Sequence, residues 1–169
     1  MNRNRTPPSV RSPHFRPSSP AGGSLLVWDQ DPLSLLATAG ALHTAGHRCV
    51  CARNASAVVQ ATTPTAGGEA PSALIIDVGN DAGAALKTLA QVREIHGNEN
   101  LPAVLVATTD WAGLEKKVEA IEAPTRCLFK PIDPQSLIAV VDSLLWMPTL
   151  EQAHRRRGSR PAKSGWVTL

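Results

Sequence analysis

The sequence has no tyrosine, few aromatic residues (4%) and only three cysteines in 169 residues. Such a small, odd number of cysteines fits a reducing compartment better than a disulfide framework, so we expect a cytoplasmic protein. No stretch reaches the roughly 18 consecutive apolar residues that a membrane helix needs, and the first residues lack the apolar core of a secretory signal. We therefore expect no membrane span.

Hydrophobic residues make up 43% of the chain, which is enough for one ordinary domain with a sizeable core. The charge is divided unevenly along the chain. Residues 1–23 carry four arginines and no acid, and residues 147–169 carry five basic residues and one glutamate. Residues 24–146 carry 13 acidic and eight basic residues. The sequence thus predicts a mildly acidic domain over residues 24–146 between two basic tails.

Both tails are poor in the residues that build a core. The first is dominated by Pro, Ser, Arg and Gly, and the last stretch, RRRGSRPAKSGWVTL, is similar. Such segments bury too little apolar surface to offset the entropy of ordering, so we expect both tails to be disordered. Basic tails can bind nucleic acid or an acidic membrane through phosphate contacts. They can equally be solvated linkers, which the absence of interleaved aromatic residues favours.

Between the tails, short apolar runs alternate with helical patterns. Asp31 and Pro32 are typical of a helix N-cap and first turn. The helix that they begin has apolar residues at the spacing of one face: Leu33, Leu36, Ala37, Gly40 and Ala41. Further helices are expected at residues 54–61, 82–96, 114–121 and 133–146. Apolar runs predict strands at residues 24–28, 48–52, 73–77, 102–107 and 126–129.

Strands that are apolar on both faces and alternate with helices indicate an α/β protein of (βα)5 type, with a doubly wound parallel sheet covered on both sides. In such sheets, functional groups collect at the carboxyl ends of the strands. Asp29 and Asp31 follow the first strand. Asp77 ends the third strand, and Lys130 follows the fifth. We therefore expect the Lys130 ammonium to point toward these carboxylates, with Pro131 fixing the turn that directs it.

This arrangement resembles the receiver domain of bacterial response regulators over residues 24–146. The segments that carry the resemblance are LLVWDQDP (25–32), ALIIDV (73–78), LPAVLVAT (101–108) and FKPIDPQSL (129–137). The resemblance implies a five-stranded, flavodoxin-like sheet with strand order 2-1-3-4-5. It also implies a signalling module of a two-component phosphorelay rather than an enzyme, with a histidine kinase or a phosphotransfer protein as its partner.

Receivers accept a phosphoryl group on the aspartate that ends the third strand, which is Asp77 here. The resemblance implies that Lys130 contacts the phosphoryl oxygens and that its bond to the following proline is cis. Asp29, Gln30 and the backbone of Gly79 fall at the positions that contact the metal. Mg²⁺ prefers oxygen ligands, commonly one or two carboxylates with phosphate and water. Gln30 offers a carbonyl oxygen but no charge, so we expect weak Mg²⁺ binding.

The positions that switch the family between two states also depart from the pattern. The hydroxyl residue expected at the end of the fourth strand falls on Ala107, and Thr108 lies one residue late. The aromatic position three residues before the lysine falls on Cys127. A switch needs two states that differ in their contacts to the ligand. We therefore expect the surface of the fourth helix, fifth strand and fifth helix to hold one conformation and to bind a protein partner, or a second copy, constitutively.

Three functions follow from these residues. The first is an atypical stand-alone receiver that is phosphorylated on Asp77. The second is a pseudo-receiver that acts as a protein-interaction module without phosphorylation. The third is a nucleic-acid binder that uses the basic tails, with the domain as their scaffold. A flavin-binding protein of similar fold is less well supported, because the sequence has no suitable glycine-rich phosphate loop.

Overall fold

The structure is a computed structural model, and it describes residues 23–65, 69–111, 113–119, 121 and 123–158. Its centre is a sheet of five parallel strands in the order β2-β1-β3-β4-β5. The strands are β1 (Ser24–Trp28), β2 (Arg48–Ala52), β3 (Ala73–Asp77), β4 (Ala103–Ala107) and β5 (Thr125–Phe129). The predicted α/β fold and strand order are confirmed.

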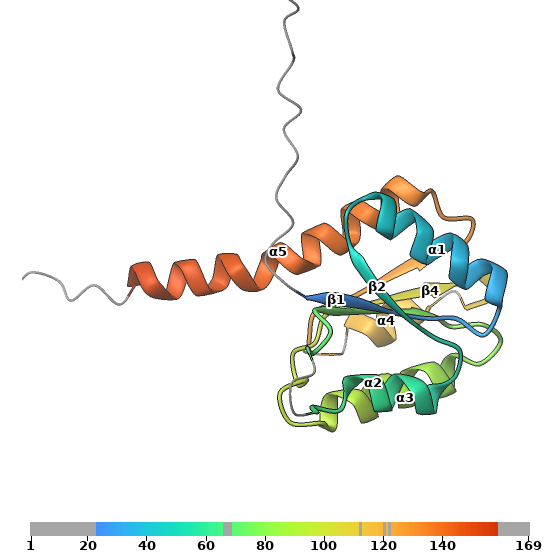
Figure 1. Cartoon of the computed structure of the whole chain (residues 1–169), viewed down its shortest axis with the longest axis horizontal. Helices are drawn as coiled ribbons and strands as arrows, with labels where there is room; N and C mark the ends of the chain where they lie inside the picture. The colour runs from blue at the N-terminus through green and yellow to red at the C-terminus, as the bar shows by residue number, and fades with distance from the viewer. Residues whose placement is uncertain (1–22, 66–68, 112, 120, 122, 159–169) are drawn as a thin grey trace, which may run out of the picture.

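Helices cover both faces of the sheet (Figure 1). Helices α1 (Pro32–Thr44) and α5 (Pro134–Gly158) lie on one face, and α2 (Ala55–Thr62) and α3 (Ala82–Glu94) lie on the other. Beyond β4, a short 3-10 helix, η1 (Thr109–Trp111), leads to α4 (Leu114–Glu119). Leu114 and Val118 of α4 pack into the core on the α2–α3 side. The sheet thus separates two apolar cores, and every residue of β4 is buried between them.

The helices begin where the local sequence predicts. The Asp31 carboxylate accepts the backbone N–H of Leu33 at 2.8 Å and caps α1. Asn54 caps α2 by accepting the N–H of Ala57 at 2.8 Å. Asp133 accepts the N–H of Ser136 at 3.0 Å at the start of α5. Such caps satisfy backbone donors that have no partner within the helix.

The face of α1 that the sequence analysis singled out is the wrong one. Leu33 and Leu36 are 77% and 68% exposed, whereas Leu35 and Leu42 are buried against the sheet. The physical reason is that α1 is apolar on nearly all sides, so the same helical spacing fits two faces. The structure therefore leaves a leucine pair exposed on a helix that has no acidic, lysine or arginine side chain.

Two helices differ in length from the prediction. Helix α4 ends at Glu119, so Ile121 lies beyond it, where its N–H bonds to the Val118 carbonyl. Helix α5 passes residue 146, the predicted end of the domain, and continues to Gly158. Residues 147–158 were expected to belong to a disordered tail, but they include good helix formers such as Leu, Glu, Gln, Ala and Arg. The rest of the predicted tails, residues 1–22 and 159–169, lies outside the described residues.

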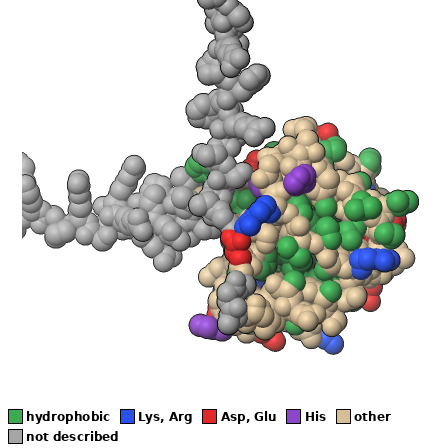
Figure 2. Space-filling view, in the orientation of Figure 1, with side chains coloured by type: hydrophobic (Ala, Val, Ile, Leu, Met, Phe, Trp, Pro, Cys, Tyr) green, Lys and Arg blue, Asp and Glu red, His purple; other side chains and the backbone are tan. Residues whose placement is uncertain are grey.

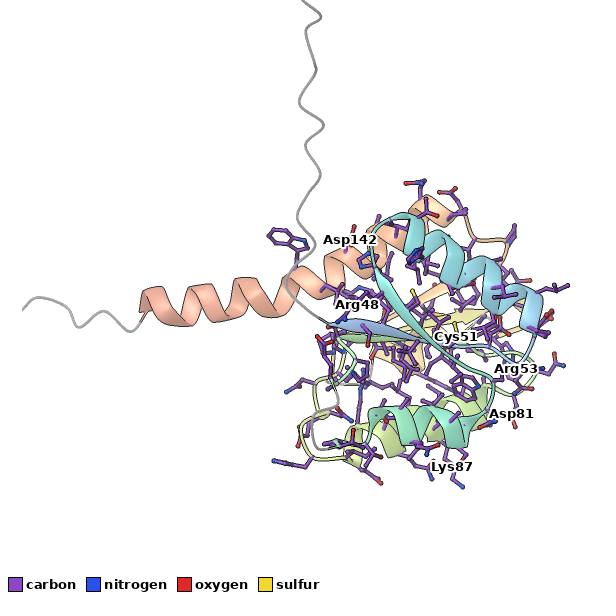
Figure 3. The ribbon with its side chains drawn as sticks, in the orientation of Figure 1. Arg48, Cys51, Arg53, Asp81, Lys87 and Asp142 are labelled. Atoms are coloured by element: carbon purple, nitrogen blue, oxygen red, sulfur yellow. The ribbon has the colours of Figure 1, made fainter. Side chains whose placement is uncertain are left out.

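Polar contacts join several elements at the edge of the sheet where the strands begin. Asp142 of α5 reaches the turn before β2, where its Oδ1 lies 3.0 Å from Nε2 of His47 (Figure 3). On the other face, the Arg93 guanidinium donates to the Leu101 carbonyl at 2.9 Å and to Thr125 Oγ1 at 2.8 Å. Burial lowers the pKa of Arg93. These contacts join α5 to the start of β2, and α3 to the starts of β4 and β5.

All three cysteines are free thiols. Burial and the neighbouring Cys51 raise the pKa of Cys49 to about 11. A thiol with such a pKa is almost wholly protonated at neutral pH and is a poor nucleophile. In the described part of the chain, no helix has the length and apolar character needed to cross a membrane.

Candidate functional site

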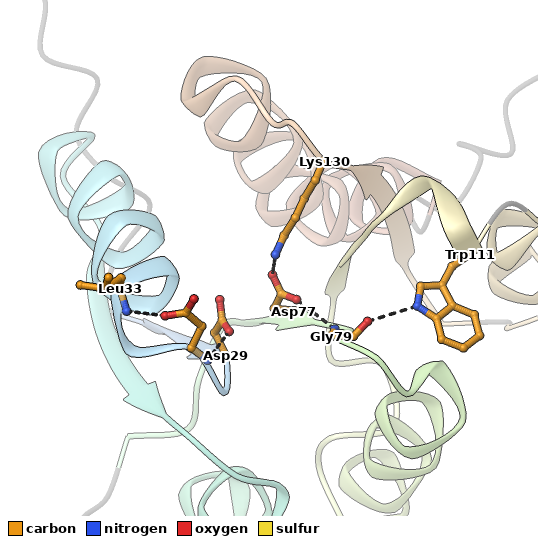
Figure 4. A network of polar contacts seen from close by, with 7 residues as sticks. Asp29, Leu33, Asp77, Gly79, Trp111 and Lys130 are labelled. Carbon is orange, nitrogen blue, oxygen red and sulfur yellow. Dashed lines mark hydrogen bonds and ion pairs between the residues drawn. The ribbon is translucent and has the colours of Figure 1, made fainter.

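Asp77 and Lys130 meet at the carboxyl edge of the sheet. Asp77 ends β3, Lys130 follows β5, and the Lys130 ammonium forms an ion pair with Oδ2 of Asp77 (Figure 4). The lysine crosses the end of β4, where its backbone N–H bonds to the Ala107 carbonyl at 2.8 Å. The Asp77 side chain is only 10% exposed and that of Lys130 is 39% exposed. The predicted contact is confirmed, and the Lys130–Pro131 bond is cis as the resemblance implies.

The second oxygen of Asp77 is also bonded. Its Oδ1 accepts the backbone N–H of Gly79 at 3.0 Å. Gly79 has a φ of +58°, a backbone conformation that glycine adopts without the steric cost that a side chain brings. The turn after β3 therefore points a backbone donor at the carboxylate, while Lys130 approaches from the other side. The two contacts hold both carboxylate oxygens of Asp77 in a fixed orientation.

The two aspartates that follow β1 have different positions: Asp29 lies at the site, and Asp31 caps α1. Asp29 is buried, and its Oδ1 accepts the backbone N–H of Asp31 at 2.8 Å. Asp31 itself caps α1, as expected, so its carboxylate is committed to Leu33. Gln30 between them is exposed. The structure thus brings one carboxylate, that of Asp29, to the edge beside Asp77 (Figure 4), while the position next to it carries no charge.

The carbonyl of Gly79 already has a partner, which the sequence analysis missed. The indole Nε1–H of Trp111 donates to it at 3.2 Å (Figure 4). Trp111 ends η1, and its ring packs against the core on the α2–α3 side. The only hint in the sequence is a tryptophan four residues after a strand, in a chain that has few aromatic residues.

This donor set fits poorly the magnesium site that the fold family implies. In the described residues, no group of three or more His, Cys, Asp or Glu side chains is placed to hold a metal ion, so Mg²⁺ at this edge would rely on one or two carboxylates together with carbonyl, phosphate or water oxygens. Of the expected donors, Asp29 accepts a backbone N–H, Gln30 is exposed and uncharged, and the Gly79 carbonyl accepts the Trp111 indole. A divalent cation at this edge would share the Asp29 carboxylate and the Gly79 carbonyl with N–H donors of the chain, which weakens its attraction to these oxygens.

The three predicted switch positions hold an alanine, a threonine and a cysteine. Ala107 is buried at the end of β4, and it has no side-chain hydroxyl. The Thr108 hydroxyl donates to Oδ2 of Asp110 at 3.3 Å, within its own loop. Cys127 is half-buried against the core on the α2–α3 side. Burial, with a smaller effect from Glu115, raises the pKa of Cys127. It therefore occupies its position as a small neutral side chain.

A cavity of about 650 Å³ opens beside the ion pair. Asp77 and Lys130 are among the residues that line it. Its walls come from α1 on one side and from the β5–α5 segment on the other, with Thr38, Ala41, Ile132 and Leu137 among them. Thr108 also borders it, so a hydroxyl lies at the cavity although Ala107 does not supply one. The cavity thus places a mostly apolar surface beside Asp77.

No model of a known protein family matches the sequence, and no curated protein matches it significantly. Solved structures of response-regulator receivers share its fold. A receiver protein from Sinorhizobium medicae WSM419 has 22% identity and a TM-score of 0.58, over 73% of this chain and 94% of that one. A receiver domain protein from Clostridium thermocellum has 16% identity and a TM-score of 0.63, over 76% and 98%.

A CheY-like receiver domain protein from Methanospirillum hungatei JF-1 has 18% identity and a TM-score of 0.62, over 78% of this chain and 99% of that one. At these identities the likeness shows the fold. The described part of this chain therefore has the fold of a response-regulator receiver domain, with Asp77 and Lys130 at the edge where such α/β sheets place their functional groups.

Proposed function

We propose that this protein is an atypical receiver of two-component signalling, with Asp77 as its phosphoacceptor. The observation that carries the proposal is the ion pair of Asp77 and Lys130 at the carboxyl edge of the sheet. An ionised carboxylate is the nucleophile that phosphoryl transfer requires, and an ammonium group offsets the charge of the phosphoryl oxygens. A cytoplasmic histidine kinase or phosphotransfer protein is the partner of matching chemistry.

In the proposed transfer, a carboxylate oxygen of Asp77 attacks the phosphorus of a phosphohistidine. The new O–P bond forms while the N–P bond breaks, and its electron pair stays on the imidazole nitrogen. The Lys130 ammonium, which already contacts Asp77, then contacts the phosphoryl oxygens and offsets their negative charge. The Gly79 N–H continues to orient the carboxylate. Because the donors of Asp29, Gln30 and Gly79 do not fit a divalent cation well, we expect weak Mg²⁺ binding and slow phosphorylation.

A second candidate is an interaction module that works without phosphorylation. Two observations favour it. Ala107 has no hydroxyl and Cys127 has no aromatic ring. Neither residue can therefore transmit a change at Asp77 to the α4–β5–α5 surface in the way that a two-state switch does. In addition, Leu33 and Leu36 expose apolar surface on α1, and hydrophobic side chains gather along α1 and in front of β2 (Figure 2). Exposed apolar patches on a soluble domain commonly mark a protein interface.

One experiment separates the two candidates. The full chain is incubated with acetyl phosphate and Mg²⁺, and its intact mass is followed for the wild type, Asp77→Asn and Asp81→Asn. Asp81 is an exposed helix cap at the same edge, and asparagine preserves the cap, so it is the matched control. We expect the wild type and Asp81→Asn to gain one phosphoryl group slowly, and Asp77→Asn to gain none.

Equal gain by Asp77→Asn would show that Asp77 is not the acceptor. No gain by any variant would contradict the receiver proposal and favour the phosphorylation-independent module.

A further inference from the structure

Gly79 uses both of its backbone polar groups at the site. Its N–H bonds to Oδ1 of Asp77 at 3.0 Å, and its carbonyl accepts the Trp111 indole at 3.2 Å. With the Lys130–Asp77 ion pair, these contacts form one line across the edge of the sheet, from the end of β5 through the turn after β3 to η1 (Figure 4). Trp111 is thus linked to the carboxylate through a single residue.

Trp111 is held at two points besides Gly79. Its backbone N–H bonds to the Thr108 carbonyl at 3.1 Å, and its ring packs against the core on the α2–α3 side. The ring is therefore oriented by packing, and its single N–H donor points to the Gly79 carbonyl. Trp111 is the last residue of η1, and Gly113, with a φ of +100°, follows just before α4. The indole thus joins the segment that leads into α4 to the turn that carries Gly79.

We infer that Trp111 is an internal competitor for divalent cations at this site: its indole N–H binds the Gly79 carbonyl oxygen and joins η1 to the turn that carries it. The indole hydrogen and a cation are both positive, and both are attracted to the same oxygen. Each therefore weakens the binding of the other to the Gly79 carbonyl oxygen. This inference goes beyond the proposed function, because it does not require Asp77 to be phosphorylated.

Two of the causes of the poor fit to magnesium then differ in kind. One is permanent, since Gln30 carries no charge where an acid would attract the cation. The other is reversible, since the hydrogen bond from the Trp111 indole to the Gly79 carbonyl can break when a cation binds. A hydrogen bond of this kind contributes modestly to a folded protein, so its release changes affinity by a small factor rather than by orders of magnitude.

The test is a Mg²⁺ titration of the full chain, followed by calorimetry for the wild type, Trp111→Phe and Trp146→Phe. Phenylalanine keeps an aromatic ring in the core and removes the donor. Trp146 is an exposed tryptophan on α5 and is the matched control. We expect Trp111→Phe to bind Mg²⁺ about fivefold more tightly than the wild type, which corresponds to the loss of one competing hydrogen bond. Trp146→Phe should bind like the wild type.

A second measurement uses the wild-type protein alone, so it does not depend on whether Trp111→Phe folds. In wild-type protein labelled with 5-fluorotryptophan, the ¹⁹F resonance of Trp111 should shift as Mg²⁺ is added, whereas that of Trp146 should not. Circular dichroism shows whether Trp111→Phe is folded; if it is not, the wild-type spectra decide. Equal Mg²⁺ affinities of wild type and Trp111→Phe, no binding by Trp111→Phe, or an unmoved Trp111 resonance would each overturn the inference. None of these outcomes bears on phosphoryl transfer to Asp77, which the acetyl phosphate experiment tests separately.

Discussion

Lys130→Met should lower the free energy of unfolding by about 3 kcal/mol, because it leaves the carboxylate of Asp77 without its counter-charge in a largely buried position. Breaking a buried pair by removing one partner costs roughly 3–5 kcal/mol. The lower end applies here, since the Lys130 side chain is 39% exposed and Asp77 retains the Gly79 N–H. Urea unfolding monitored by circular dichroism measures the change.

The double variant makes this test specific to the pair. Asp77→Asn with Lys130→Met removes both charges, so its stability should lie within about 1 kcal/mol of the wild type, well above that of Lys130→Met alone. Lys87→Met, at an exposed position on α3, should change the stability by less than about 0.5 kcal/mol. If Lys130→Met were as mild as Lys87→Met, the ion pair would not be an interaction on which this edge depends.

Leu144→Ala should cost about 3 kcal/mol, because Leu144 of α5 is buried in the core on the α1–α5 side. Trp146, two residues later, is exposed on the same helix, so Trp146→Ala should cost less than about 1 kcal/mol although it removes a larger side chain. Thermal or urea unfolding of the two variants compares them directly. Equal losses would contradict the packing of α5 on the sheet.

The parts of the fold that local signals control could be predicted from the sequence. Asp31 followed by Pro32, and Asn54, marked the starts of two helices, and both cap as expected. The apolar runs that became β1, β3 and β4 are buried on both faces of the sheet, so no alternation was needed to find them. The meeting of Asp77 and Lys130 followed from strand order, because parallel strands end at one edge.

The features that the sequence did not predict depend on contacts between distant segments. Nothing near Trp111 in the chain indicates that its indole would find the Gly79 carbonyl, which lies on a different strand-to-helix turn. Similarly, the apolar spacing of α1 fits two faces, and only packing against the sheet selects Leu35 over Leu36. Asp29 could be placed at the site from its position after β1, but its bond to the Asp31 N–H was not predictable from residue type alone.

We propose that this receiver fold keeps the Asp77–Lys130 pair but holds its α4–β5–α5 surface in one conformation. The most direct test is a set of amide ¹H–¹⁵N spectra of the full chain with and without beryllofluoride and Mg²⁺, with Asp77→Asn as the variant that should not bind the mimic. We predict that the amides of Gly79 and Lys130 shift, which shows that the mimic is bound, and that changes end at the loops around them, including Trp111. Shifts that spread through α4, β5 and the packed part of α5 would contradict the claim, because they would show that a switch operates without a hydroxyl at Ala107 or a ring at Cys127.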